Sequence, residues 1–275
     1  MKFETKIGMS EPDAIYVHGY HLTEDLIGNI TLADMAFVGA MHRRPTPEES
    51  RMLNACMVAI CEHGFTPSSI SARLTYLGAP EAVQAAVAAG LLGAGSVYLG
   101  AMENTAQMLQ EGWKTYGAED VAKVAAFIIE ERKANKLQVM GFGHPIHKPV
   151  DPRTIRLFAL AQELGFYGKH IALMNEIHRL MSEQKGKPMT LNAAGAIGAI
   201  LSDMDVHFRV VKAFAVAARA VGLIGHIAEE MEAGRKESMA QKLYDHIEAN
   251  TLYTNQRATI EKNRLNRDYK GGAIE

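Results

Sequence analysis

The chain of 275 residues has few cysteines and no excess of charge of either sign. Its two cysteines, Cys56 and Cys61, lie on one expected helix at a spacing that makes them face different directions. We therefore interpret them as small core residues and not as a disulfide or a metal-binding pair. The formal net charge of −2 gives no global attraction to nucleic acid or to an anionic membrane, so neither is an expected partner.

Long uncharged apolar runs are also missing. No stretch reaches the roughly 18 apolar residues that a membrane-spanning helix needs, and no apolar signal core follows Met1 to Lys6. A phosphate-binding Gly-x-x-x-x-Gly-Lys loop is missing too, so nothing in the sequence indicates the use of ATP. Together these features predict a cytoplasmic protein.

Apolar residues at helical spacing dominate the chain and predict an all-α fold. Pro47 and two glutamates open one helix, and further helices are expected over residues 81–92, 102–113, 119–135, 154–165, 169–184, 192–204, 208–232 and 237–250. Short strands are expected only around Ala14–Val17 and Leu137–Met140. A repeating strand–helix–strand order is missing, so we expect helices to pack on helices.

Small residues are concentrated in residues 82–93, 192–199 and 213–220. Small side chains let two helix axes approach closely, which suits both a tight core and a subunit interface, and the sequence does not choose between them. His226 lies in an apolar helix and is expected to be a core or interface histidine.

The stretch Met140-Gly-Phe-Gly-His-Pro-Ile-His-Lys-Pro-Val-Asp-Pro-Arg153 carries the clearest signal of chemistry. Two glycines before His144 permit close backbone approach to a ligand, and the prolines stiffen the segment. Lys148 and Arg153 add positive charge beside His144, and the ordinary pKa of a histidine side chain is about 6.5. The stretch therefore predicts an active-site loop for an anionic substrate, with a structural turn as the alternative.

Gly-Phe-Gly-His144 followed by Lys148 and Asp151-Pro-Arg153 resembles the signature loop of the citrate synthase family. Other segments follow in that family's order: His18-Gly-Tyr20, Glu62-His63-Gly64, Leu191-Asn-x-x-Gly-x-Ile-Gly198 and Arg219-Ala-Val-Gly-Leu-Ile-Gly-His226. The similarity runs from about residue 14 to residue 254. The length is closer to that of the citryl-CoA lyase module at the C-terminus of ATP citrate lyase than to that of a full citrate synthase.

The resemblance implies a large helical domain made of residues 1–102 and 206–275, with a smaller helical domain of residues 103–205 inserted into it. The active site is then expected in the cleft between the two domains, which closes as substrate binds. The resemblance also implies a homodimer or a larger homo-oligomer.

Individual roles follow from the same resemblance. His144 is expected to bond to the oxygen on the electrophilic carbon and to move a proton there, while His63, Arg153 and Arg219 hold a carboxylic acid. Coenzyme A is expected along Val139, Met140, Gly141, Phe142, Gly143, Lys187 and Asn192. It enters as a thioester substrate, and no covalently bound cofactor is predicted. No metal is predicted either, because His170 and His178 lack a carboxylate at ligand spacing.

Three positions depart from the family pattern. Tyr98 replaces a histidine that stabilises the thioester enolate, and its phenol is either an enolate donor or a core aromatic. Ala194 replaces the aspartate that exchanges a proton with the acetyl methyl group, and Asp203 and Asp205 follow too far along the chain to replace it. Pro145 replaces an arginine, and an arginine-rich segment near the chain end is missing, which suggests a substrate with fewer or different carboxylates.

The expected function is that of a carbon–carbon lyase. It would cleave a 3-hydroxyacyl-CoA such as citryl-CoA to acetyl-CoA and a keto acid, oxaloacetate, because the alanine at position 194 harms cleavage less than condensation. A second hypothesis keeps the fold and the CoA pocket for decarboxylation or thioester hydrolysis. A third is a non-catalytic acyl-CoA-binding subunit, against which the joint presence of His63, His144, Arg153 and Arg219 argues.

Overall fold

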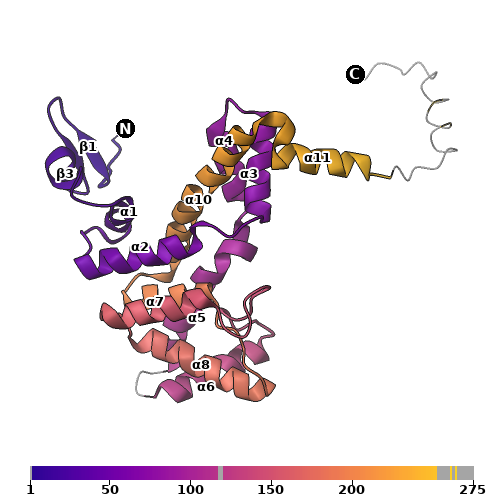
Figure 1. Cartoon of the computed structure of the whole chain (residues 1–275). Coiled ribbons are helices and arrows are strands. Elements are labelled where there is room, and N and C mark those ends of the chain that lie inside the picture. Colours follow the sequence, from indigo (N-terminus) through magenta and orange to yellow (C-terminus); the bar gives the residue numbers. More distant parts are fainter. Residues whose placement is uncertain (1, 117–119, 253–260, 262–263, 265–275) are drawn as a thin grey trace, which may run out of the picture.

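The computed structural model describes residues 2–116, 120–252, 261 and 264, apart from the side chains of Val97 and Tyr98. Helices make up nearly all of the regular structure, so the predicted all-α fold is confirmed (Figure 1). The α-helices are α1 (Leu32–Met41), α2 (Pro47–Cys61), α3 (Pro67–Gly78), α4 (Val83–Leu92), α5 (Gly100–Tyr116), α6 (Val121–Ala134), α7 (Pro152–Glu163), α8 (Lys169–Lys185), α9 (Ala193–Asp203), α10 (Phe208–Glu237) and α11 (Met239–Ala249). Two short π-helical segments are η1 (Leu22–Leu26) and η2 (Gly95–Leu99).

A small antiparallel sheet precedes the helices. Its strands β1 (Gly8–Ser10), β2 (Ile15–Val17) and β3 (Tyr20–His21) pair in the order β1-β2-β3. The strand expected around residues 14–17 is therefore confirmed. The one expected at residues 137–140 is wrong, because backbone pairing there is limited to a single bridge between Phe142 and Leu191.

Helices α1 and α3 were not expected from the sequence. Helix α1 is apolar nearly all along its length, which hides its helical period, and α3 is rich in serine and threonine, which are weak helix formers. Both begin at a capping box, in which Thr31 and Thr66 accept a hydrogen bond from the backbone N–H three residues later. Thr46 caps α2 in the same way, so all three helix starts are fixed by local hydrogen bonds.

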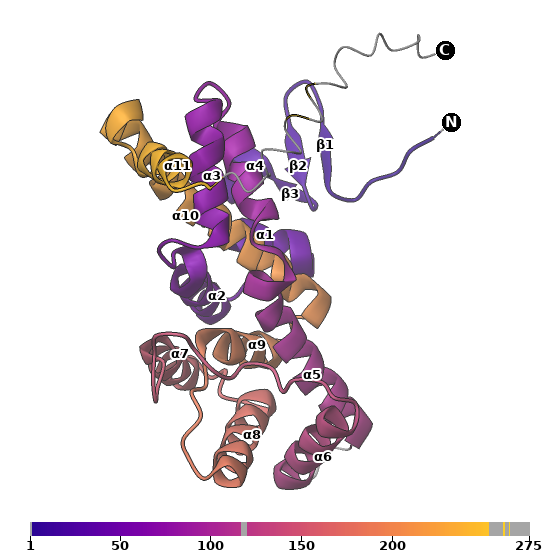
Figure 2. The same ribbon diagram turned by 90° about the vertical axis from the view of Figure 1, so that its right-hand side faces the viewer.

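The helices form two groups in space. Helices α5 to α9 lie together at one end, and α3, α4, α10 and α11 lie together at the other, with α2 between them (Figures 1 and 2). Contacts of α10 with α2 and α5, and of α2 with α7 and α9, join the two groups. The sequence-based boundary at residue 102 falls inside α5, and that at residue 205 falls between α9 and α10. These domain limits stay a prediction.

Helix α10 is, among the described helices, the one that is long and apolar enough to cross a membrane by length and composition alone. Buried core helices pass the same test. Helices α2, α3, α4 and α5 pack against α10, and Arg219, His226 and Glu230 are buried along it. These contacts place charged groups of α10 inside the protein.

The small residues serve close packing within the chain. A Cβ atom at Gly198 of α9 would lie 2.9 Å from the carbonyl oxygen of Met102 in α5. At Gly90 of α4 it would lie 2.6 Å from a methyl group of Leu223 in α10. The closest approach is at Gly222 of α10, where a Cβ atom would come within 1.9 Å of the carbonyl oxygen of Cys61, the last residue of α2.

We expect Gly222→Ala to lower the free energy of unfolding by roughly 1–3 kcal/mol, the usual cost of overpacking. The added methyl group meets backbone atoms, which cannot turn away as a side chain does. Urea denaturation measures the change. Gly78→Ala is the matched control, because a Cβ atom there meets nothing within 4 Å. Equal unfolding midpoints for the two variants would contradict the close approach of α10 to α2.

Candidate active site

A cavity of about 450 Å³ lies where α2, α7, α9 and α10 meet. All four residues that the sequence assigned to the acid half of the substrate line it: His63, His144, Arg153 and Arg219. Apolar side chains from several elements complete the wall, namely Ile60, Phe65, Leu99, Met102, Pro145 and Ile146. The structure thus brings together residues that are as far as 156 positions apart in the sequence (63 to 219).

His144 is held by its own loop. The backbone N–H groups of Ile146 and His147 donate to its Nδ1 atom at 3.2 and 2.9 Å. A neutral imidazole that accepts at Nδ1 carries its proton on Nε2. His144 therefore offers an Nε2–H donor to the cavity. The rings of His63 and His147 stack on it with centroid distances of 5.4 and 4.3 Å.

Arg153 is held by the buried carboxylate of Asp151. Asp151 is the N-cap of α7, where its Oδ1 atom accepts from the backbone N–H of Arg153 at 3.0 Å. The same carboxylate accepts from Nε and Nη2 of the Arg153 side chain at 3.0 and 2.8 Å. The guanidinium plane is therefore fixed, with its Nη2 atom 3.3 Å from Nε2 of His144.

Arg219 reaches the cavity from α10. It is only 7% exposed, and its Nη1 atom is buried without a hydrogen-bond partner in the described part of the chain. Burial lowers the pKa of Arg219, although Glu62 acts in the opposite direction. A buried guanidinium N–H without an acceptor is costly, and an anionic ligand oxygen would remove that cost.

His63 follows directly on the end of α2. Glu62 is the C-cap of that helix, and its Oε1 atom accepts from the backbone N–H groups of His63, at 2.7 Å, and Gly64. Gly64 has φ +65°, which a residue with a side chain rarely adopts. The sharp turn that follows α2 therefore depends on Gly64 and on the carboxylate of Glu62.

The surroundings of both site histidines favour the neutral form. Burial and the nearby Arg153 and Arg219 lower the pKa of His63. Burial, His147 and Arg153 lower the pKa of His144, against the attraction of Asp151. The cavity thus combines two fixed cations with two imidazoles whose pKa values are lowered, which is a suitable set for binding carboxylate and hydroxyl oxygens.

The two segments expected to bind coenzyme A lie side by side. Gly143 N–H donates to the carbonyl of Thr190 at 2.7 Å, Asn192 N–H donates to that of Gly141 at 3.0 Å, and Asn192 Nδ2 donates to Gly143 at 2.8 Å. At Gly141, which has φ +90°, a Cβ atom would lie 2.7 Å from Gly195 of α9, so only glycine fits. Gly143 and Asn192 also line the cavity.

A second cavity, of about 490 Å³, adjoins these segments. Val139 and Phe142 line it together with Lys133 and Lys185, so it has a local positive charge. Lys187 lines neither cavity, and Met140 and Gly141 are turned toward the helix packing and not toward either wall. The structure therefore brings part of the predicted CoA set to these cavities.

Tyr98, Pro145 and Ala194 are the three residues that depart from the family pattern. Tyr98 lies in η2, but its side chain is outside the described part of the structure, while its neighbour Leu99 lines the cavity. Pro145 and Ala194 line the cavity themselves, and no carboxylate stands at Ala194. Asp203 is used elsewhere, because it accepts from backbone N–H groups at the start of α8 and from His170 Nδ1 at 3.0 Å.

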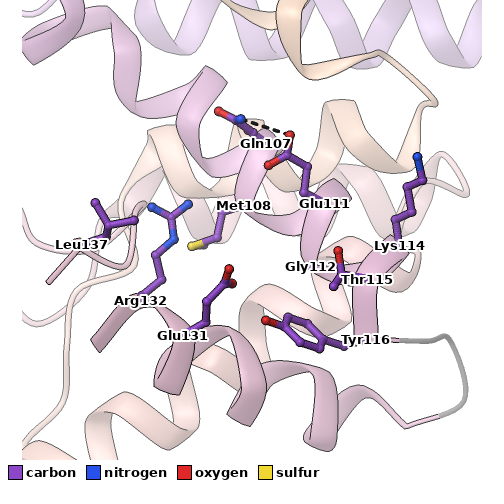
Figure 3. A pocket seen from close by; sticks show the side chains of 10 residues that line it. All are labelled: Gln107, Met108, Glu111, Gly112, Lys114, Thr115, Tyr116, Glu131, Arg132 and Leu137. Carbon is purple, nitrogen blue, oxygen red and sulfur yellow. Dashed lines mark hydrogen bonds between the residues drawn. The ribbon is translucent and has the colours of Figure 1, made fainter. Parts of the chain in front are cut away.

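A larger cavity, of about 740 Å³, lies between α5 and α6 (Figure 3). None of the residues predicted for catalysis or substrate binding lines it. Its charged side chains have both signs on both helices, Glu111 and Lys114 on α5 and Glu131 and Arg132 on α6. Size alone therefore does not identify the site. Among the described residues, no group of three or more potential ligands is placed to hold a metal ion.

Sequence reasoning assigned no role to Glu62, Asp151 or His147. Asp151 was open to prediction, since an aspartate before Pro-Arg is a typical N-cap. Glu62 precedes His63 in the motif Glu62-His63-Gly64, but the hydrogen bonds that it accepts from the following turn depend on the path of the backbone. The contact of His147 with His144 depends on the loop conformation in the same way.

The sequence model of the citrate synthase C-terminal domain matches residues 16–240. Since this match covers most of the chain, the protein belongs to the citrate synthase family. The citrate synthases of Acidithiobacillus ferridurans and Synechocystis are 26% and 29% identical to it over 201 and 199 residues, each covering 70% of the chain. The chain spans about half the length of these relatives, 50% and 48%.

Solved structures give a similar result. Citryl-CoA lyase from Hydrogenobacter thermophilus is 34% identical, with a TM-score of 0.80 and coverage of 92% of this chain and 95% of that one. ATP citrate lyase from Methanosaeta concilii, in complex with (3S)-citryl-CoA, is 19% identical, with a TM-score of 0.73 and coverage of 95% and 43%. At that identity the second likeness shows the fold alone.

The lowered pKa values of His63 and His144 predict a pH dependence of stability. Their pKa is lower in the folded protein than in the unfolded chain, so the unfolded chain binds more protons as the pH falls below about 6.5. The free energy of unfolding should therefore decrease from about pH 7.5 to about pH 5.5, with a smaller decrease in the double variant His63→Asn, His144→Asn. Chemical denaturation at both pH values measures this, and an equal decrease in both proteins would contradict it.

Proposed function

We propose that this protein is a carbon–carbon lyase that cleaves a 3-hydroxyacyl-CoA such as citryl-CoA to acetyl-CoA and a keto acid such as oxaloacetate. The observation that carries the proposal is the pair of donors at one point of the cavity, Nε2 of His144 and Nη2 of Arg153, 3.3 Å apart. Two donors face each other stably only when an acceptor stands between or beside them. A substrate hydroxyl or carbonyl oxygen is that acceptor.

The second cation completes the binding of the acid. Arg219 lines the same cavity, and its Nη1 atom has no hydrogen-bond partner among the described residues. This donor suits a substrate carboxylate beside the reacting carbon. The likeness to citryl-CoA lyase, at 34% identity over 95% of that chain, supports the same substrate class. The basic cavity beside Val139 and Phe142 supports a coenzyme A phosphate nearby.

In the proposed cleavage, the bond between the hydroxyl-bearing carbon and the α-carbon of the thioester breaks. The hydroxyl becomes a carbonyl and releases its proton, and the thioester leaves as an enolate that takes a proton at carbon. His144 and Arg153 stabilise the negative charge on the oxygen as that proton leaves. Because Nδ1 of His144 is already an acceptor for Ile146 and His147, the ring acts first as a donor, and the proton passes to water.

Reprotonation of the enolate is the weak step in this site. Ala194 lies in the first turn of α9 at the cavity wall, and the described part of the cavity offers no carboxylate there. Water can supply the proton to a released enolate, but abstraction of a methyl proton in the reverse direction needs a base. The loss of such a group typically costs about 10²–10⁴-fold in rate, so cleavage is favoured over condensation.

Ala194 also supports a second candidate, an acyl-CoA decarboxylase or thioesterase that uses the same pocket. Such a reaction needs no base at the methyl group. The two candidates differ in products, because cleavage yields a keto acid and acetyl-CoA, whereas the second yields carbon dioxide or free coenzyme A.

The experiment incubates the purified protein with citryl-CoA and a panel of 3-hydroxyacyl-CoAs and identifies the products by mass spectrometry. We expect acetyl-CoA and a keto acid from wild type. His144→Ala should lower the turnover rate by about 10²-fold or more and leave the affinity for the thioester nearly unchanged. Arg219→Met should raise KM, since the carboxylate then loses its cation.

Glu111→Gln, in the cavity between α5 and α6, is the control and should behave as wild type. Release of carbon dioxide or free coenzyme A would favour the second candidate. Tight thioester binding without turnover would favour a binding subunit, and neither binding nor turnover would contradict all three.

We also propose that the chain forms a homodimer along α10. Val221, Ile224 and Met231 are exposed on this helix, and Leu92 is exposed on α4, which packs beside it. An apolar helix face is suited to pair with its own copy about a twofold axis. Light scattering after size exclusion should give a dimer for wild type and a monomer for Ile224→Asp. Ile247→Asp, on exposed α11, should stay dimeric, and a monomeric wild type would contradict the proposal.

A further inference from the structure

A buried polar cluster stands directly behind the active-site cavity and has no part in the chemistry described so far. It consists of Arg73 of α3 and of His226 and Glu230 of α10, which are 2%, 8% and 3% exposed. Glu62, at the end of α2, is half exposed and reaches from this cluster to the cavity, which it lines. Three helices therefore contribute charge to one buried point next to the site.

The contacts in the cluster form a continuous chain. Nε of Arg73 donates to Nδ1 of His226 at 3.0 Å, and Nη1 donates to Oε1 of Glu230 at 2.5 Å. On the other side of the ring, Nε2 of His226 lies 2.8 Å from Oε2 of Glu62, which is an ion-pair distance without the alignment of a hydrogen bond. The remaining oxygen of Glu62 accepts from the backbone N–H groups of His63 and Gly64.

The direction of these contacts is fixed by chemistry. A guanidinium group has donors only, so Nδ1 of His226 must be the acceptor. The proton of the neutral ring is then on Nε2, which faces Glu62. The ring tautomer, and with it the polarity of the whole chain, is set by Arg73, as a carboxylate sets the tautomer of a histidine in other catalytic sites.

We propose that Arg73 and His226 are positioning residues, which hold Glu62 and, through the backbone of His63 and Gly64, place the His63 ring in the active site. The significance of that placement rests on the proposed function, in which His63 binds the acid. The positioning of the His63 ring by these contacts does not depend on the proposed function.

The structure gives a reason why the turn needs such support. Gly64 has a positive φ, and Glu62 is the acceptor for the two consecutive N–H groups of the turn that follows α2. The His63 ring is stacked on His144 at 5.4 Å, so a shift of the turn changes the surroundings of both rings. A displacement near 1 Å at such a site can cost about 10²-fold in rate.

A purely structural role would be the alternative. Buried ion clusters of this kind are weak evidence for stability, since their desolvation offsets much of their attraction. The protein contains a matched control: His170 of α8 is also buried, and its Nδ1 atom pairs with Asp203 at 3.0 Å. This second histidine–carboxylate pair does not line the active-site cavity.

The test compares His226→Ala, His226→Gln and the control His170→Ala. Glutamine at 226 can accept from Arg73 through its carbonyl and donate to Glu62 through its amide, so it should restore the chain. The first readout is the ring chemical shifts and titration of His63 by NMR, which needs no substrate. We expect both to change in His226→Ala, to return toward wild type in His226→Gln, and to stay unchanged in His170→Ala.

The second readout is functional. For His226→Ala we expect kcat/KM with citryl-CoA to fall roughly 10-fold to 100-fold, and the Kd for oxaloacetate to rise, with an unchanged Kd for coenzyme A. If His226→Ala does not fold, Glu62→Gln breaks the chain at an exposed link, because its amide then faces the Nε2–H donor of His226. The same NMR change is expected there.

An unchanged His63 signal in both His226→Ala and Glu62→Gln would overturn the proposal, whatever the activity. A changed His63 signal in a protein that neither binds oxaloacetate nor cleaves citryl-CoA would support the positioning chain and contradict the proposed function. Equal effects of His226→Ala and His170→Ala on His63 would show a general loss of stability and would overturn the positioning role.

Discussion

The buried carboxylate of Asp151 is the interaction on which the rest of the site depends. It begins α7 as an N-cap, binds the Arg153 side chain through two nitrogen atoms, and accepts from the backbone N–H of Ala193 at the start of α9 at 3.1 Å. A single side chain thus fixes two helix starts and one cation of the cavity. Because it is fully buried, loss of the Arg153 side chain would leave its charge without a counter-ion in the interior.

The glycines supply the second constraint, close contact between backbones. The loop that carries His144 lies on α9 because Gly141 and Gly195 both lack a side chain at the contact. Helix α10 lies on the end of α2 because Gly222 faces Cys61. Through these contacts, residues from distant parts of the chain reach one cavity. Mutations at such glycines therefore act on the site through geometry and not through lost chemistry.

Together, these constraints define what the site can do. Donors of His144 and Arg153 meet at one point of the cavity, and two histidines with lowered pKa values stand beside two cations. The carboxylate that would move a proton at the thioester methyl group is not at Ala194, and Asp203 is fully occupied at the start of α8. The preserved part of the site carries the histidines and the two cations, and the altered part is the wall at Ala194. This division is the basis of our proposal that bond cleavage suits the site better than bond formation.

The sequence by itself determined the helical class, most helix positions and the group of His63, His144, Arg153 and Arg219, because these follow from local periodicity and from motifs that survive in order. It did not reveal α1, whose apolar composition hides the helical period, or α3, whose serine and threonine residues are weak helix formers. Nor did it reveal the chain from Arg73 through His226 to Glu62, whose members are up to 164 positions apart (62 to 226). Only the tertiary structure decided those contacts, since a hydrogen bond between distant residues depends on how helices pack and leaves no local pattern in the sequence.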